Sequence, residues 1–324
     1  MTHKPIVVGI DIAKEKIDVA IRLGAEASFA SSPEGRRQLL AWLKEHAVGK
    51  AVMEASGGYE KSWAKLLRGA GVAVAIVDPK RVRHFAKSAG QLAKNDPIDA
   101  RMIAWFGEAF SERLGKPDDA EREELDQLVT ARLGITRLKD QIDSWGEHEQ
   151  PKVVQKAYRA LLEAVARQQA KLEAVIADKI EQTERFAKSD AIIQSVPGLA
   201  DVSAAGLIAF LPELGLVDRQ AASALLGVAP FDNDSGKRHG QRHITGGRKK
   251  LRCLLFTPLV GAVTRHNPVL KAHYQRLKAR GKPHKVAVIA CMRKLIGILN
   301  TMLARGEKWD PTKHAISRRA ASAA

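Results

Sequence analysis

The sequence predicts an α/β domain at the N-terminus, a helical middle region and a basic, mainly α C-terminal domain. Short β-branched runs alternate with helical stretches over residues 6–110, which indicates a central sheet. Between residues 120 and 187 glycine is nearly absent and charges of both signs are dense, which favours long helices. The chain of 324 residues is long enough to bury more than one core. We therefore expect domains at 1–110, 111–189 and 190–324.

The order of the expected elements predicts the topology of the first domain. Short connections between three strands, at 6–12, 17–23 and 27–31, indicate antiparallel pairing. There follow a helix at 33–45, a strand at 50–54, a helix at 58–69, a strand at 72–77, and helices that begin at Pro79 and Pro97. The order β-β-β-α-β-α-β-α is that of the ribonuclease H-like fold. In the last domain we expect the final two helices at 268–280 and 284–305.

The middle region contains a short heptad pattern. Leu128, Ile135 and Ile142 are spaced seven residues apart, and Pro151 is the only strong helix breaker in this region. This pattern favours a protruding coiled coil through which the protein associates with itself. The alternative is a pair of helices that pack on their own domain, which so few heptads leave open.

The positive charge is concentrated in one block. The net charge is +17, and the 72 residues from Ser235 to Gly306 hold 17 Lys or Arg and no Asp or Glu. Such an excess points to a polyanionic partner, since a merely solvated face would include acidic residues. The cations expected to contact phosphate are Lys237, Arg238, Arg242, Arg248, Lys249, Lys250 and Arg252.

Cysteine use and hydropathy favour a soluble, cytoplasmic protein with no membrane partner. Cys253 and Cys291 have no neighbouring pair at metal-ligand spacing, which is typical of reduced thiols. The first residues lack the features of a signal peptide. The longest late apolar run, 286–292, is far shorter than the roughly 20 residues that span a bilayer.

Four acidic residues stand where the expected strands end or a helix begins. Asp11 and Glu54 close two apolar strands, and a carboxylate there is costly to bury without a partner. Asp96 and Asp99 flank Pro97, so both can lie on one side of a first helical turn. Taken alone, this last pair is typical of an ordinary helix start.

The convergence of these acids indicates a metal site. Four carboxylates at one sheet edge would repel one another unless divalent cations neutralised them. One or two Mg²⁺ ions held in this way support phosphoryl transfer, and the basic block suggests that the substrate is nucleic acid. Actin-like ATPases also begin with Gly-Ile-Asp, but Ile12-Ala13-Lys14 replaces the glycines that would let the backbone approach phosphate.

Several short blocks of the sequence form a recognisable set. The N-terminal blocks are 9–19, 53–59 and 94–101, and the C-terminal ones are 195–199, 227–230, 234–237 and 244–248. These blocks resemble those of DEDD-type insertion-sequence transposases, and the resemblance extends over nearly the whole chain in the right order. The chain departs from the family pattern in two places: Ala200 stands where a second glycine is usual, and a segment that is Arg-Arg-Ile-Trp-like in one branch is here Arg242-His243-Ile244-Thr245.

The resemblance implies a resolvase-like catalytic domain followed by a serine-bearing domain. It implies that Asp11, Glu54, Asp96 and Asp99 bind Mg²⁺, and that Ser235 forms a covalent phosphoserine bond with DNA. It also implies a guide RNA encoded by the element, double-stranded donor and target DNA, and a homo-oligomer in which dimers assemble into a tetramer. Without the resemblance, the residues around Ser235 read as a turn.

Two alternatives remain open at this stage. A metal-dependent nuclease acting on branched DNA would need the four acids and leave Ser235 idle. A nucleic-acid-binding protein without chemistry would use the same acids only as capping groups.

Overall fold

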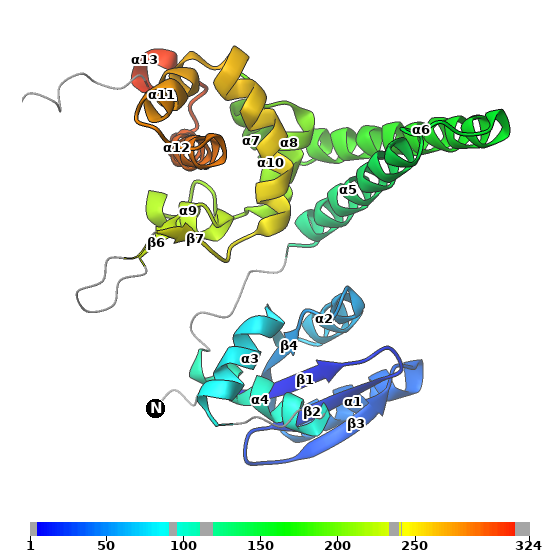
Figure 1. Ribbon diagram of the computed structural model, residues 1–324. Helices are drawn as coiled ribbons and strands as arrows, with labels where there is room; N and C mark the ends of the chain where they lie inside the picture. The colour runs from blue at the N-terminus through cyan, green and yellow to red at the C-terminus, as the bar shows by residue number, and fades with distance from the viewer. Residues whose placement is uncertain (1–4, 91–95, 111–118, 233–239, 241, 315–324) are drawn as a thin grey trace, which may run out of the picture. The chain divides into compact units, whose positions relative to one another are not determined.

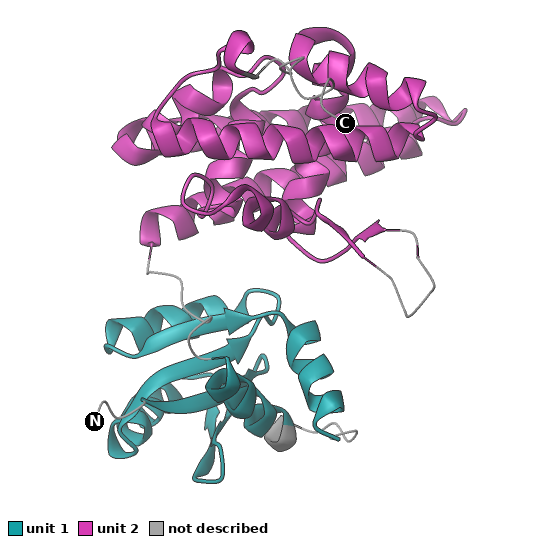
Figure 2. Cartoon of the chain, turned by 90° about the vertical axis from the view of Figure 1, so that its left-hand side faces the viewer, with its two compact units in different colours: residues 1–118 teal, residues 119–324 magenta. Residues whose placement is uncertain are grey.

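The computed structural model describes residues 5–90, 96–110, 119–232, 240 and 242–314. The chain forms two compact units, residues 1–118 (unit 1) and 119–324 (unit 2), shown in Figure 2. The division into domains at residues 110 and 189 stays a prediction.

Unit 1 is built on a five-stranded mixed sheet with the strand order β3-β2-β1-β4-β5 (Figure 1). The strands are β1 (Ile6–Ile12), β2 (Lys16–Ile21), β3 (Glu26–Ala30), β4 (Val48–Glu54) and β5 (Ala73–Val77). The helices are α1 (Pro33–Glu45), α2 (Tyr59–Gly69), α3 (Pro79–Ser88) and α4 (Asp96–Ala109). β1, β2 and β3 pair antiparallel, whereas β4 is parallel to both β1 and β5. Along the chain these elements follow the order β-β-β-α-β-α-β-α, which the sequence predicts for a ribonuclease H-like fold.

The alternation of residues along the strands assigns a core to each face of the sheet. Val8 packs with Leu39 of α1 on one face. Val7 and Val52 pack with Phe106 of α4 on the other. Because side chains alternate along a strand, every second residue of β1 and β4 points toward α4.

Local sequence signals start the helices of unit 1. The Ser32 side chain accepts a hydrogen bond from the backbone N–H of Gly35, and Pro33 is the first residue of α1. Asp78 caps α3 in the same way, with Pro79 first in the helix. A side-chain cap followed by proline satisfies an exposed backbone donor and fixes the entry angle of the helix.

Unit 2 is mainly helical. Its elements are α5 (Ala120–Trp145), α6 (Lys152–Gln182), α7 (Glu184–Gln194), α8 (Asp201–Phe210), α9 (Arg219–Leu226), β6 (Pro230–Phe231), β7 (His243–Ile244), α10 (Lys249–Gly261), a π-helical turn (Ala262–His266), α11 (Pro268–Ala279), α12 (His284–Arg305) and α13 (Pro311–His314). The ends of the last two long helices agree with the sequence prediction to within one residue. The two short strands were not predicted, because two residues carry no alternation.

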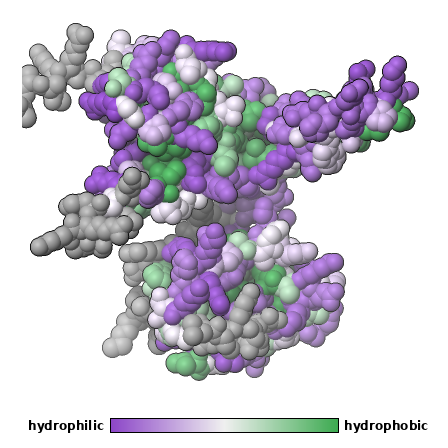
Figure 3. All heavy atoms as spheres, viewed as in Figure 1, coloured by the Kyte–Doolittle hydropathy of each residue, from purple (hydrophilic) through white to green (hydrophobic). Residues whose placement is uncertain are grey.

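The helices α5 and α6 form an antiparallel hairpin whose base belongs to the core of unit 2 (Figure 1). Leu128 packs against that core and Ile142 is buried, so the chain itself covers part of the predicted heptad seam. Figure 3 shows mostly hydrophilic side chains along the hairpin, with hydrophobic ones at its far end. Trp145 and Val153 are exposed there. Self-association through the hairpin stays a prediction.

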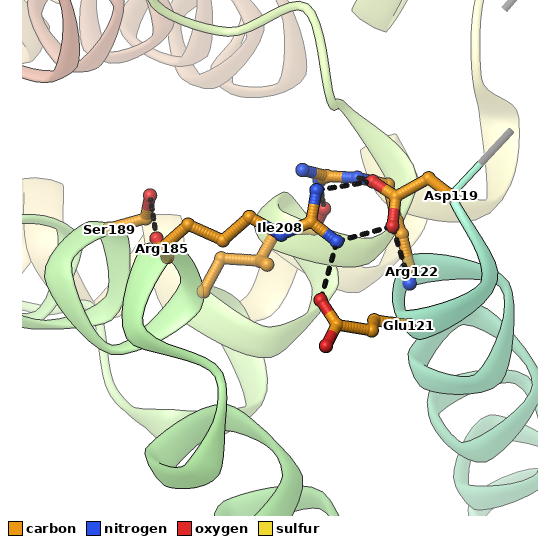
Figure 4. A network of polar contacts seen from close by, with 6 residues as sticks. All are labelled: Asp119, Glu121, Arg122, Arg185, Ser189 and Ile208. Atoms are coloured by element: carbon orange, nitrogen blue, oxygen red, sulfur yellow. Dashed lines mark hydrogen bonds and ion pairs between the residues drawn. The ribbon is translucent and has the colours of Figure 1, made fainter. Parts of the chain in front are cut away.

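A charged network fixes the start of α5 (Figure 4). The Asp119 carboxylate caps the helix by accepting from the backbone N–H of Arg122 at 3.0 Å. It also accepts from Nε of Arg122 at 2.9 Å and from Nη1 of Arg185 at 2.8 Å. Arg185 also donates to Glu121 at 2.8 Å. Burial raises the pKa of Asp119, but the two arginines outweigh it and lower the pKa to about 2.

Within the described residues, α12 is the one helix long and apolar enough to cross a membrane by length and composition. However, 61% of its apolar stretch is buried inside the structure. Cys291 and Leu295 of this helix are fully buried in the core of unit 2. This burial is typical of the central helix of a folded domain.

Candidate active site and nucleic-acid interface

Two of the predicted acids lie at the carboxyl ends of neighbouring parallel strands. The register between β1 and β4 pairs Gly9 with Val52 and Ile10 with Met53. Asp11 and Glu54 are the next residues on the two strands, so they lie at the same edge of the sheet. Both side chains are half-buried. Gly9 and Val52 face α4, and Asp11 and Glu54 lie two residues beyond them on their strands. Both carboxylates therefore lie on the α4 face of the sheet.

A close backbone contact brings a third acid to this edge. A Cβ on Gly9 would lie 2.1 Å from the carbonyl oxygen of Ala100, so only glycine lets α4 approach β1 so closely. Further along α4, Gly107 contacts Val7, which precedes Gly9 on the strand. The helix therefore runs opposite to β1, and its first turn, which contains Asp99, lies by the carboxyl end of the strand.

We call Asp11, Glu54 and Asp99 the carboxylate edge. Asp96 is the first residue of α4, one turn from Asp99, and its side chain lies outside the described residues. Among the side chains that are described, no three carboxylate, imidazole or thiol groups lie close enough to form a metal cluster by themselves. Mg²⁺ commonly binds through one or two carboxylates and completes its shell with water and substrate phosphate. The all-oxygen donor set of this edge fits such an ion.

The structure adds Asp18, which the sequence reasoning missed. It lies directly opposite Asp11 in the β1–β2 register and is buried. Its carboxylate accepts from the Ser28 hydroxyl and pairs with Nζ of Lys16 at 2.9 Å. The available signal was an acid within an otherwise apolar strand. Opposed acids on one face repel, so Ser28 and Lys16 stabilise the charge that Asp18 adds beside Asp11.

A second missed residue, Glu60, organises the turn after Glu54. Its Oε2 accepts from the backbone N–H of Ser56 at 3.0 Å and of Gly58 at 2.8 Å, and from the Ser56 hydroxyl at 3.2 Å. Burial raises the pKa of Glu60, but these hydrogen bonds outweigh it and leave the pKa below its ordinary value. Gly57 and Gly58 have φ of 73° and 113°, which L side chains rarely adopt. The turn therefore holds Glu54 at the strand end.

The predicted nucleophile and two of the predicted phosphate-binding cations, Ser235, Lys237 and Arg238, lie outside the described residues. The segment that contains them is flanked by β6 and β7, which pair antiparallel. Arg242 and Asp232 form an ion pair next to this two-stranded stem, at 2.5 Å. One predicted phosphate-binding cation thus has an acidic partner within the chain.

A second close backbone contact anchors this stem to the rest of unit 2. A Cβ on Gly247 would lie 2.2 Å from the backbone nitrogen of Gly227, and both residues have positive φ. Arg252 of α10 donates to the carbonyl oxygens of Gly227 and Gly246, both at 3.0 Å. Two of the sequence blocks that carry the family resemblance, 227–230 and 244–248, therefore pack against each other.

Two more of the predicted cations have partners within unit 2. Arg248 forms a two-pronged ion pair with Glu213, with both N–O distances 2.6 Å. Nζ of Lys250 donates to the Thr130 hydroxyl at 2.8 Å and lies 4.7 Å from the centre of the Phe210 ring. These contacts hold the start of α10 in place. That Arg248 and Lys250 contact phosphate stays a prediction.

Lys249, between them in the sequence, is exposed. In the part of the chain that the structure describes, no hydrogen bond or ion pair holds its ammonium group. Of the predicted cations with described side chains, Lys249 is therefore the one whose charge is not already engaged.

Two protein-family models match the chain. A DEDD transposase model named for IS110 matches residues 8–144, and a model described as the transposase IS116/IS110/IS902 family matches residues 190–275. Together the two matches span more than half of the chain.

Two relatives and one solved structure to which the chain is similar have the following identities and coverage. The pilin gene-inverting protein of Moraxella bovis is 26% identical over 95% of this chain and 98% of its own length. An uncharacterized 44.8 kDa protein of the insertion element IS116, from Streptomyces clavuligerus, is 29% identical over 39% of this chain and 32% of its own. RuvC of T. thermophilus, solved with a Holliday junction substrate, is 15% identical with a TM-score of 0.28, covering 35% of this chain and 99% of RuvC. The chain belongs to the IS116/IS110/IS902 family of transposases and is a DNA transposase or recombinase enzyme.

Proposed function

We propose that this transposase depends on Mg²⁺ and exchanges strands of donor and target DNA through a covalent bond between Ser235 and DNA. We further propose that an RNA encoded by the element guides it and that it works as a homo-oligomer, with dimers assembling into a tetramer. The observation that supports the proposal is the carboxylate edge: β1 and β4 end side by side at Asp11 and Glu54, and the first turn of α4, which contains Asp99, lies by the end of β1.

The acids of unit 1 would hold the metal ion. Asp11, Glu54 and Asp99, together with Asp96 at the start of α4, offer only carboxylate oxygens, which Mg²⁺ prefers. When bound, Mg²⁺ would neutralise a phosphodiester and stabilise the charge that develops on the attacking and leaving oxygens. Without a cation, the like charges of these side chains repel one another.

Ser235 would store the energy of the broken DNA bond. Its Oγ loses a proton and bonds to phosphorus, while the bond from phosphorus to the bridging oxygen of the strand breaks and that oxygen leaves as a hydroxyl. A hydroxyl of the incoming strand then attacks the same phosphorus and restores the serine. One bond forms and one breaks in each step, so no added energy source is needed. A relative named for inverting a gene supports exchange rather than degradation.

The basic block supports a nucleic-acid partner. Its 17 Lys or Arg without an acid would give binding that weakens steeply with salt. Phe256 and Tyr274 are its only aromatic residues, so base stacking is not the main mode of contact. A protein that holds phosphates and stacks few bases needs another source of sequence choice, which is consistent with a guide RNA.

A denaturing gel tests the role of Ser235. The full chain is incubated with Mg²⁺, the guide RNA and labelled target DNA, as the parent and as Ser235→Ala. We expect the parent to give a protein-linked DNA band and the variant to give none, while both bind DNA equally, because the hydroxyl is not needed for electrostatic contact. Ser62→Ala, an exposed serine of unit 1, is the matched control and should behave like the parent.

Two outcomes would contradict the proposal. If Ser235→Ala still forms the linked band, another residue is the nucleophile. If the variant cuts as well as the parent and releases free ends, the enzyme is a metal-dependent nuclease in which water attacks.

A further inference from the structure

Lys294, in the middle of α12, has a buried side-chain ammonium group. α12 packs between α9 and α11 (Figure 1). Cys291, Lys294 and Gly297 are three residues apart, so they lie along one side of this helix. Nζ of Lys294 is buried and has no hydrogen-bond partner among the residues that the structure describes. A buried ammonium group without a partner is costly.

A second cation reaches this side of α12 from α9. A Cβ on Gly297 would lie 2.4 Å from Nε of Arg219, so the glycine makes room for the arginine side chain across the helix. Asn300, one turn further, fixes the segment before α9. Its Oδ1 accepts from the N–H of Gly215 at 2.8 Å, and its Nδ2 donates to the carbonyl of Val217 at 2.7 Å. The position of Arg219 is therefore built into the fold.

Two further groups come from α11. Nη2 of Arg276 lies 3.2 Å from Nδ1 of His273 and donates to it, which requires a neutral imidazole. Burial lowers the pKa of His273, and Lys294, Arg276 and Arg219 lower it further. Burial also lowers the pKa of Lys294, as do Arg276 and Arg219. The four groups thus lie within electrostatic reach of one another.

No negative charge in the described structure balances them. Among the described residues, Arg219, Arg276 and Lys294 form no ion pair with a carboxylate. Arg248 in the same unit, by contrast, is paired with Glu213. Cys291 is the one group that favours the charged form of Lys294. Burial raises the pKa of that thiol to about 11, so it is neutral at physiological pH.

We propose that Arg219, His273, Arg276 and Lys294 form a phosphate-binding site, here called the cationic cluster. Lysine and arginine donors from three helices suit an oxyanion with several acceptor oxygens. Arg219 of α9 and Arg276 of α11 are exposed, so solvent reaches two of the cationic groups. The phosphate belongs either to a nucleic-acid strand or to a free anion, and for the strand the inference rests on the proposed function.

Thermal melting of the full chain tests the site itself. Inorganic phosphate is compared with chloride at equal ionic strength, for the parent, for Lys294→Met and for the control Lys285→Met, an exposed lysine of the same helix. We expect phosphate to raise the midpoint of the parent and of the control by several degrees, since a ligand that binds only the folded state stabilises it. Lys294→Met should lose this rise.

A second variant keeps the test independent of folding. Arg276→Gln removes an exposed side chain from α11 and should reduce the same phosphate response. If both variants respond to phosphate as the parent does, or if chloride has an equal effect on the parent, the cluster is not a phosphate site.

Fluorescence anisotropy with a labelled oligonucleotide identifies the source of the phosphate. If a nucleic-acid strand supplies it, Lys294→Met should weaken binding about tenfold and lower the salt dependence by about one ion, while Lys285→Met changes neither. If oligonucleotide binding is unchanged and only the melting response is lost, the site takes free phosphate. The Ser235 gel measures the proposed function separately, so either proposal can fail while the other stands.

Discussion

The acids of unit 1 and the cations of unit 2 are both functional candidates from the sequence, but the structure treats them differently. Asp11 and Glu54 are held by strand register, so their backbone positions alone bring them together. Arg248 and Lys250 carry their charges at the ends of long flexible side chains, and both charges are hydrogen-bonded within the chain. An acid at a strand end can therefore be placed from the fold, whereas a surface cation cannot be assigned to a ligand until its internal partners are known.

The largest expected effect is on the contact that builds the carboxylate edge. Gly9→Ala places a methyl group against the backbone of α4 and should cost about 3 kcal/mol of unfolding free energy. Chemical denaturation measures this. Gly69→Ala is the control, because a Cβ there meets no atom within 4 Å. Equal stability of the two variants would show that α4 does not depend on Gly9.

The next prediction separates two adjacent cations. Arg248→Met removes the two-pronged ion pair with Glu213 and should cost about 1.5 kcal/mol of stability. Lys249→Met should change stability by less than about 0.5 kcal/mol, but it should reduce the salt dependence of DNA binding by about one ion. Denaturation and anisotropy titrations at several salt concentrations measure both. A large loss of stability in Lys249→Met together with none in Arg248→Met would contradict this difference between the two cations.

Metal binding tests the other side of the comparison. Mg²⁺ at about ten times its dissociation constant should stabilise the protein by about 1.4 kcal/mol, because it relieves repulsion at the carboxylate edge. Asp11→Asn should abolish this gain, while Asp78→Asn, which changes only a helix cap, should keep it. A melting series with and without Mg²⁺ is the measurement. The same gain in Asp11→Asn would place the metal elsewhere.

The smallest expected effect concerns Asp119, whose carboxylate is paired with arginines of the same unit. The folded pKa of Asp119 is about 2, below its ordinary value of 3.8, so its stabilisation is present above about pH 4 and is lost as the pH falls toward 2. The contribution is about 1 kcal/mol after solvent screening. Asp119→Asn should therefore be less stable than the parent at pH 7 and equal to it near pH 2. A pH series of denaturation curves that stay parallel would contradict this.

The sequence predicted the parts of the fold and site that depend on local pattern. The strands that carry Asp11 and Glu54 follow from apolar runs, and the start of α4 follows from Asp96 and Pro97. Distant contacts were beyond such reasoning. The role of Gly9 depends on Ala100, and that of Arg248 depends on Glu213. Neither partner is signalled by the residues around it.

The contact of Gly9 with Ala100 also bears on how the protein is made. Unit 1 emerges from the ribosome with β1 first and α4 last, and the edge is incomplete until both are present. Because contacts between residues far apart in sequence form late, a nascent chain that ends before α4 has two of its acids in place but lacks the helix that supplies the others. Under the proposed function, such a chain would bind divalent ions weakly, so the metal site would be complete only once the whole of unit 1 had been synthesised and folded.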